Sequence, residues 1–301
     1  MNATVVPYTN HLVICGWKQE MHLLIIEMLH ANPQWSPKDI VIVSGASDEL
    51  VKTLKGVPEV EGVHLIRDEY FSEAALIRAS ITTASKALIL ADRSDRSESS
   101  TETDAKTVMA AMAIKKLAPL LYVTTELLDL DFLQYVKMAK VDEVIYSREY
   151  WRILLANATS ASGITHVIAE LLDSNSTCML TSVQIPQNFI GRKFSDLAEF
   201  FAHQKRLRMI CIGLLENTEN VNVLKRKALV AAQKTTEVRN VLNSLTLIRE
   251  MECNVPKLNP GDGYIIQKDS MAVVLTNQDS EGGPQTISDD DASGKDVYSY
   301  E

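Results

Sequence analysis

The chain has 301 residues, of which 46% are hydrophobic and 23% are charged, and its net charge is −9. At roughly 100–200 residues per domain this length predicts about two globular domains, and the negative charge argues against a general nucleic-acid-binding surface. No apolar run reaches the ~18–20 residues of a membrane-spanning helix, and residues 1–10 lack the layout of a secretory signal. The cysteines are far apart, which disfavours a zinc site or a disulfide framework and fits a reducing cytosol; they are Cys15, Cys178, Cys211 and Cys253.

The first half of the chain alternates short apolar runs with helical patterns. The apolar run from His11 to Cys15, for example, is followed by apolar residues at helical spacing between Met21 and Leu29. Strands are expected at 11–15, 40–43, 63–66, 87–91, 120–124 and 143–146, and helices at 21–29, 48–54, 73–78, 103–117 and 132–139. Continuous apolar strands joined by helices predict an α/β fold, with a Rossmann-like, doubly wound parallel sheet over residues 1–146.

Ligands of such a sheet bind at the carboxyl ends of its strands. The residues that follow the strands, or lie shortly after them, are the candidate cofactor-binding residues Gly16, Trp17, Lys18, Ser44, Asp48, Asp68 and Asp92, together with Glu126. Of the dinucleotide fingerprint G-x-G-x-x-G only Gly16 is present, and Glu20 opposes the charge that Lys18 offers to a phosphate. The pattern disfavours tight NAD binding in the usual pose, and no histidine lies in a recognisable catalytic motif.

Two carboxylates suggest a cation instead. Asp92 follows the fourth expected strand and Glu126 the fifth, so neighbouring strand ends bring both to one crevice. Divalent hard cations prefer carboxylate and carbonyl oxygens, which makes Asp92 and Glu126 candidate metal ligands. Four further acids, Asp95, Glu98, Glu102 and Asp104, lie nearby in the chain. The alternative is that these acids are solvated, with Asp104 near the amino end of its helix interacting with the helix dipole.

The second half of the chain predicts a smaller domain. Two helical segments, at 148–157 and 164–172, are joined by small residues, and alternation then indicates a strand near 179–186. A helix capped by Ser195 and strands at 208–215, 264–266 and 271–275 follow. Residues 279–301 hold seven acids and one lysine and are expected to be a disordered, solubilising tail.

Several segments together resemble the RCK domain, the regulator of potassium conductance. They are HLVICGW (11–17), ALILADRSD (87–95), TDAKTVMAAMAIKKL (103–117), YVTTELLD (122–129) and MAKVDEVI (138–145). Their order and spacing agree with the family over about residues 11–175. Residues 177–278 resemble the TrkA-C-like α+β domain that follows such sheets, with an insertion near 217–250.

The resemblance implies a regulator of potassium flux, not an enzyme. Residues 147–176 would form a helix–turn–helix crossover for dimerisation, and the dimers would assemble into a tetrameric or octameric ring. That ring would act on a potassium channel pore domain at the cytoplasmic face of the membrane, without a span in this chain. Whether the chain is a separate subunit or the cytosolic part of a channel stays open.

The resemblance also suggests ligands. In calcium-gated relatives, an acid after the fourth strand and two after the fifth form the ion site; Asp92 and Glu126 match two of these, while Thr124 stands where the third is expected. This favours a divalent cation such as Ca²⁺. The alternative is an NAD(H)- or adenine-nucleotide-binding TrkA-type peripheral subunit of a potassium uptake system, with strand-end acids such as Asp68 and Asp92 on the ribose or base. An NAD-dependent oxidoreductase is the least favoured.

Overall fold

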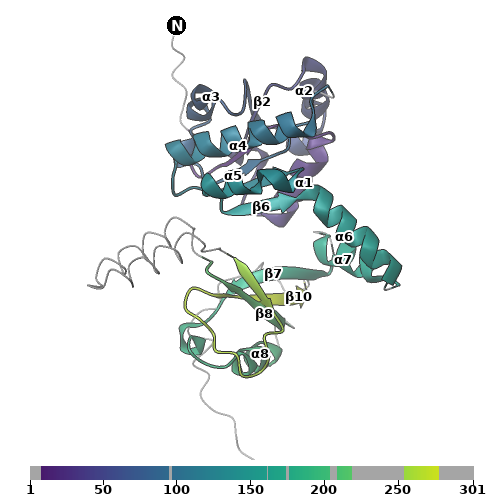
Figure 1. The fold of residues 1–301 in the computed structure, drawn as a ribbon, viewed down its shortest axis with the longest axis vertical. Coiled ribbons are helices and arrows are strands. Elements are labelled where there is room, and N and C mark those ends of the chain that lie inside the picture. The colour runs from purple at the N-terminus through teal and green to yellow at the C-terminus, as the bar shows by residue number, and fades with distance from the viewer. Residues whose placement is uncertain are drawn as a thin grey trace, which may run out of the picture. The chain divides into compact units, whose positions relative to one another are not determined.

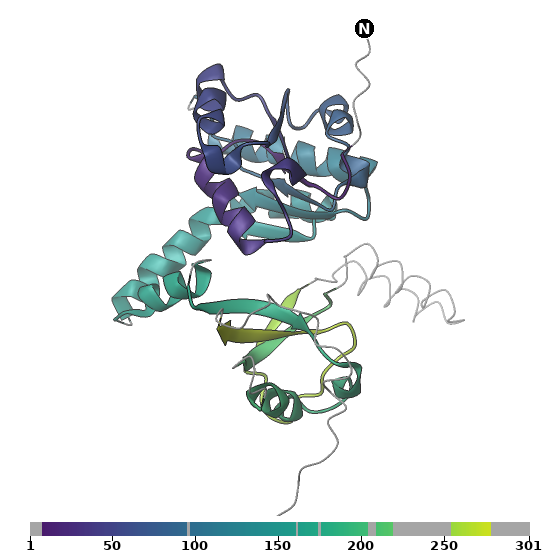
Figure 2. The same cartoon turned by 180° about the vertical axis from the view of Figure 1, so that it is seen from behind.

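A computed structural model describes residues 8–94, 97–160, 162–173, 176–203, 209–218 and 254–277. These residues form two compact units that divide between Ser162 and Gly163 (Figures 1 and 2). The predicted acidic tail and residues 219–250 of the predicted insertion lie outside the described residues. Within the described parts of the chain, every helix is too short or too polar to cross a bilayer.

The first unit contains a six-stranded parallel sheet in the order β3-β2-β1-β4-β5-β6. Its strands are β1 (Leu12–Cys15), β2 (Ile40–Ser44), β3 (His64–Arg67), β4 (Lys86–Ile89), β5 (Tyr122–Leu127) and β6 (Glu143–Tyr146). Its helices are α1 (Met21–Ala31), α2 (Asp48–Lys55), α3 (Glu73–Arg78), α4 (Ser100–Leu117) and α5 (Leu133–Met138). Strand order and direction confirm the predicted doubly wound sheet. One boundary matters for the site: β5 extends to Leu127, so Glu126 lies within the strand and not after it.

The sheet is buried on two faces because alternate side chains of each strand point in opposite directions. One face, with Val13, Val41 and Ile89, packs against helices α3 to α5. The other, with Ile14 and Ile42, packs against α1 and α2. On this second face Leu88, Thr124 and Ile145 stay half-buried, so strands β4 to β6 are only partly covered within the unit.

Helix α6 (Ser147–Ser160) belongs to the first unit, and α7 (Ile164–Leu172) belongs to the second. Neither has a buried residue among those described. Trp151 and Leu155 of α6 are 67% and 64% exposed, and Leu172 of α7 is 74% exposed. Both helices of the predicted crossover are therefore present, with large apolar side chains in the open.

The second unit contains a four-stranded antiparallel sheet in the order β7-β10-β8-β9. The strands are β7 (Cys178–Gln184), β8 (Ile210–Glu216), β9 (Val255–Leu258) and β10 (Met271–Asn277), and α8 (Phe194–Ala202) packs on them. Its core includes Leu197, Phe201 and Leu214. A side-chain carbon at Gly213 would lie 2.5 Å from the Lys257 carbonyl oxygen, so β8 and β9 approach closely only because this residue is glycine.

Two local predictions in this unit are wrong. Lys193 precedes α8 as its N-cap without a side-chain hydrogen bond, so Ser195 lies in the first turn and does not cap the helix. Residues 264–266 form no strand; Ile265 makes one isolated bridge to Lys193. The residues before α8 contact residues 264–266 through this bridge. A tertiary contact of this kind cannot be predicted from a local sequence pattern.

Candidate functional site

The candidate site lies at the point where the strand order of the sheet reverses, between β1 and β4. It includes the carboxyl ends of β1, β4 and β5. Gly16 follows β1 with a φ of +96°, a conformation that L side chains rarely adopt. A side-chain carbon at this position would lie 3.0 Å from the Leu90 carbonyl oxygen and 3.3 Å from Cβ of Asp92. Gly16 therefore allows the loop after β1 to pack directly on the loop after β4.

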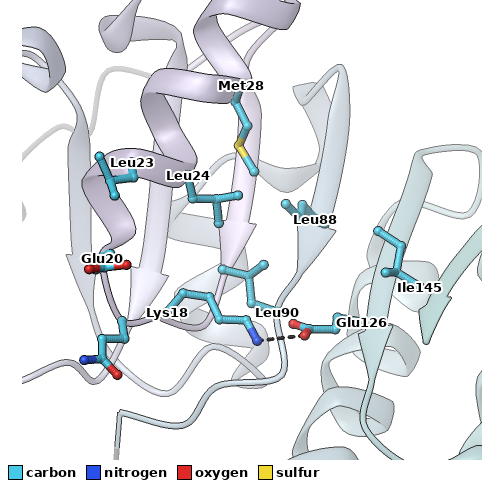
Figure 3. Close-up of a pocket in the computed structure, with 10 residues that line it drawn as sticks. Lys18, Glu20, Leu23, Leu24, Met28, Leu88, Leu90, Glu126 and Ile145 are labelled. Carbon is cyan, nitrogen blue, oxygen red and sulfur yellow. Dashed lines mark hydrogen bonds and ion pairs between the residues drawn. The ribbon is translucent and has the colours of Figure 1, made fainter. Parts of the chain in front are cut away.

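Lys18 and Glu126 form an ion pair across this edge (Figure 3). Nζ of Lys18 donates to Oε1 of Glu126 at 2.7 Å, and the backbone N–H of Ala91 donates to Oε2 at 3.0 Å. Glu126 thus connects the ends of three strands. The sequence analysis assigned Lys18 and Glu126 to different ligands and missed their pairing, although opposite charges at the ends of nearby strands were a signal for it.

Asp92 lies beside this pair but has its own partners. Its Oδ1 accepts a hydrogen bond from the Ser94 N–H at 2.8 Å, and its carbonyl oxygen accepts one from the Thr103 hydroxyl at 3.3 Å. Asp92 also lies near Lys106, whose pKa is raised mainly by its hydrogen bond to Glu98 and further by the charge of Asp92. Among the described residues, no three His, Cys, Asp or Glu side chains are grouped closely enough to hold a metal ion.

The remaining candidate residues lie apart from Asp92 and Glu126. Trp17 is 2% exposed and belongs to the core on the α1 face, so packing accounts for it. Ser44 is fully buried, and its hydroxyl accepts a hydrogen bond from the Ala46 N–H at 3.2 Å. Asp48 pairs with Arg67, and Asp68 pairs with Arg78. Both acids after β2 and β3 therefore have arginine counter-ions.

The amino end of α1 lacks the glycine loop of a dinucleotide site. Glu20 is the N-cap of α1, in a left-handed conformation with φ of 59° and no side-chain cap. A carboxylate at a helix amino end interacts favourably with the helix dipole, but it repels a phosphate at the same place. The acidic side chain of Glu20 thus lies where a dinucleotide-binding loop would bring its backbone close to the pyrophosphate.

A groove of about 490 Å³ lies beside the ion pair (Figure 3). Its apolar lining comes from α1, β4 and β6: Leu23, Leu24, Met28, Leu88, Leu90 and Ile145. Lys18, Gln19, Glu20 and Glu126 supply its polar lining. The groove follows from the incomplete cover of β4 to β6, which the sequence analysis did not anticipate.

Asp104 is not solvated, contrary to the alternative interpretation of the acids near Asp92. It is fully buried in α4, and its two oxygens accept hydrogen bonds from the N–H groups of Leu128 and Asp129 at 3.0 and 2.8 Å. Burial raises the pKa of this carboxyl, while the two hydrogen bonds act in the opposite direction. Asp104 fixes the loop after β5, the strand that carries Glu126.

The comparisons with known proteins point to one family. Residues 8–125 match the model of the calcium-activated potassium channel slowpoke-like RCK domain. The putative potassium channel protein YugO of Bacillus subtilis is 28% identical over 141 residues, which are 47% of this chain and 39% of that protein. The calcium-gated potassium channel TvoK of Thermoplasma volcanium is 24% identical over 194 residues, 63% of this chain and 53% of that protein. The chain thus spans only about half, or less, of these relatives.

A solved structure agrees on the fold. The human SLO3 gating ring superimposes with a TM-score of 0.55 and 14% identity, covering 88% of this chain and 44% of that one. The strand order of the first unit, the motifs at 11–17 and 87–95, and the family model that spans both lead to the same assignment. Residues 8–125 of this chain are therefore similar to slowpoke-like RCK domains.

Proposed function

We propose that this chain is a gating-ring module that controls potassium flux through a channel pore at the cytoplasmic face of the membrane. The ring responds to a bound ligand, and the ligand is a divalent cation such as Ca²⁺. The module is a regulator and not an enzyme. The family of residues 8–125 and the channel names of both curated relatives support the proposal.

The observation that carries the proposal is the position of Asp92 and Glu126 at the switch point of the sheet. Glu126 binds the Ala91 N–H, one residue before Asp92, so the two carboxylates lie at adjoining strand ends. Carboxylate oxygens are the preferred ligands of Ca²⁺. The name of TvoK, a calcium-gated channel, points to the same class of ligand.

Thr124 makes this a weak site. Residues two apart in a strand share a face, so the Thr124 hydroxyl lies on the same face of β5 as Glu126. A hydroxyl supplies one neutral oxygen where a third carboxylate would add a negative charge. We therefore expect a lower Ca²⁺ affinity than a site with three carboxylates would have.

The partner that completes the ring is a second copy of the chain. Helices α6 and α7 expose Trp151, Leu155 and Leu172, and apolar faces of this kind gain stability when another surface covers them. Leu155→Glu combined with Ile168→Glu should give a monomer in sedimentation velocity, whereas Ile77→Glu, an equally exposed position on α3, should not change the assembly. A wild-type chain that stays monomeric at tens of micromolar would contradict the ring.

Calorimetry and thermal shift with Ca²⁺, Mg²⁺, NADH and ATP test the ligand. At 100 times its Kd a ligand adds ~2.7 kcal/mol of stability, which is readily measured. Ca²⁺ should bind the wild type, and both Asp92→Asn and Glu126→Gln should weaken it. Asp131→Asn, an exposed acid past the end of β5, is the matched control. Binding of NADH or ATP without a response to either cation would favour the nucleotide-binding, TrkA-type alternative.

A further inference from the structure

The antiparallel sheet of the second unit has one face that takes no part in the core of the unit. The core lies between α8 and the face that carries Leu214 and Val274 (Figure 1). Successive residues of a strand point to opposite faces, so Val273 and Leu275 of β10 point away from α8. Neither residue belongs to the core cluster of this unit. We call the side of the sheet on which they lie the open face.

The open face is apolar across all four strands. Residues directly opposite each other in neighbouring strands share a face, so the register identifies its other members. They include Leu180 of β7, Ile210 and Leu215 of β8, Leu258 of β9 and Met271 of β10. No described residue at these register positions of the open face is charged.

The sequences of the strands are those of a sheet buried on two sides. An antiparallel sheet with one solvated face normally alternates apolar and polar residues. Strands β8 and β10 instead contain the unbroken runs ICIGLL (210–215) and MAVVL (271–275). Ile210 and Leu258 are nevertheless 62% and 63% exposed. Exposed apolar side chains that adjoin in this way mark a surface that another element covers.

A segment of the chain leaves this sheet and returns to it at the same place. Residues 219–253 connect β8 to β9, and the Asn254 N–H donates a hydrogen bond to the Asn217 carbonyl oxygen at 3.2 Å. Both ends of the segment are therefore held at one end of the β8–β9 pair. Half of the segment, about 17 residues, would span ~25 Å as a helix at ~1.5 Å per residue. The seven residues of β8 span ~24 Å at ~3.4 Å per residue, so the segment is long enough to cross the face.

The sequence of the segment matches the chemistry of the open face. Apolar residues recur at the spacing of one side of a helix, at Val238, Val241, Leu242 and Leu245. Polar residues such as Asn240 and Asn243 fall on the other side of the same helical pattern. A helix of this kind is stable when its apolar stripe packs on an apolar surface. The uncharged open face is such a surface, and it belongs to the two strands that the segment connects.

We infer that residues 238–245 dock as an amphipathic helix on the open face of the second sheet, on the side opposite α8. The sheet is then covered by a helix on both sides, a layered arrangement in which each apolar face is buried. The segment occupies the face within its own chain, so this face is not an interface between copies. The inference concerns the second unit and does not depend on the proposed ligand.

The test is the rate of maleimide labelling of single cysteine substitutions in the full chain, read peptide by peptide in a mass spectrometer to separate them from the native cysteines. Leu258→Cys reports on the open face, and Asp262→Cys reports on an exposed turn outside it. We expect Leu258→Cys to be labelled at least tenfold more slowly than Asp262→Cys. Equal rates would show an uncovered face and overturn the inference.

Two changes in the segment identify what covers the face. Leu242→Asp combined with Leu245→Asp should raise the labelling rate of Leu258→Cys about tenfold, because it places charges on the docking side of the helix. Asn240→Asp combined with Asn243→Asp adds the same charge to the other side and should change the rate less than twofold.

Replacement of residues 220–253 by a short Gly-Ser turn is a second variant, since the Asn217–Asn254 hydrogen bond already brings the two ends together. It should speed the labelling of Leu258→Cys as much as the double Asp substitution does, and leave Asp262→Cys unchanged. Protection of Leu258→Cys that survives both changes, or that is lost when the otherwise unaltered chain is diluted, would assign the face to another occupant such as a second copy. Either result would overturn the inference.

Discussion

Two lysine–carboxylate pairs lie at opposite edges of the same parallel sheet, and they differ in burial. At the amino edge, Lys115 and Asp142 are 6% and 0% exposed, whereas Lys18 and Glu126 at the carboxyl edge are 29% and 10% exposed. Lys115 Nζ also donates to the Leu121 carbonyl, and Asp142 accepts the Val123 N–H, so the buried pair is bound into the backbone. The same chemistry is thus sealed from water at one edge and partly open to water at the other.

This difference in burial predicts that the two ion pairs contribute unequally to the stability of the fold. Removing one partner of a buried pair leaves an uncompensated charge away from water, which is strongly destabilising. Where the lysine of a pair reaches solvent, water can take part of its place, so its removal costs less than in a fully buried pair. We therefore expect the amino edge to determine stability, and the carboxyl edge to determine ligand binding.

The largest expected effect is that of Lys115→Met. This substitution leaves the Asp142 carboxylate buried without its counter-ion, and it should lower the free energy of unfolding by about 3–5 kcal/mol. Urea denaturation measures it. Lys116→Met, which removes an exposed pair one residue away, should cost less than about 1 kcal/mol. Equal losses in both variants would abolish the contrast between buried and exposed pairs.

Asp104→Ala should have an intermediate effect. It removes the acceptor of two backbone N–H groups, those of Leu128 and Asp129, and should cost on the order of 1–3 kcal/mol in urea denaturation. Because the loop after β5 then loosens next to Glu126, Ca²⁺ binding should weaken as well. Asp131→Ala serves as control. Full stability of Asp104→Ala would show that this loop is held by other contacts.

His11 should make the stability of the fold sensitive to acid, with a smaller effect than that of Asp104→Ala. It is 1% exposed, its Nε2 lies 2.8 Å from the Ala79 carbonyl oxygen, and burial lowers its pKa from the ordinary 6.5. The unfolded chain therefore binds a proton at higher pH than the folded chain does, and stability falls as the pH drops below about 6.5.

His11→Gln should flatten this part of the stability profile, measured by urea denaturation between pH 5 and pH 8. His64 and Asp39 are the charged groups whose fields reach His11. Replacing the half-buried His64 by Gln is therefore a useful comparison. An unchanged slope in His11→Gln would remove His11 as the cause.

Lys18→Met should cost less stability than Lys115→Met. The Glu126 side chain is 10% exposed and keeps its hydrogen bond from the Ala91 N–H, whereas the Asp142 side chain is 0% exposed, so the loss in the absence of Ca²⁺ should stay below the ~3–5 kcal/mol of a fully buried pair. This outcome is the counterpart of the large loss at Lys115. A loss comparable to that of Lys115→Met would make the carboxyl-edge pair a structural element and break the comparison.

The order and type of most elements could be predicted from the sequence. Apolar runs such as 40–43 and 11–15 need burial on both faces, and the helical spacing between them leaves few alternatives to a doubly wound sheet. Helix α3 and strand β6 have the predicted bounds, Glu73–Arg78 and Glu143–Tyr146. The switch point then followed from topology alone, so Asp92 and Glu126 could be named as residues at one edge.

Which charges at that edge pair with one another could not be predicted, because the pairing depends on the three-dimensional fold. Lys18 and Glu126 are separated by more than a hundred positions in the chain, and the register of β1, β4 and β5 brings them to 2.7 Å. Burial likewise separated Asp104, which is inside, from Glu102, which is exposed, and it placed Trp17 in the core. Local patterns report periodicity and propensity, whereas pairing and burial depend on strand register, and register is a property of the whole sheet.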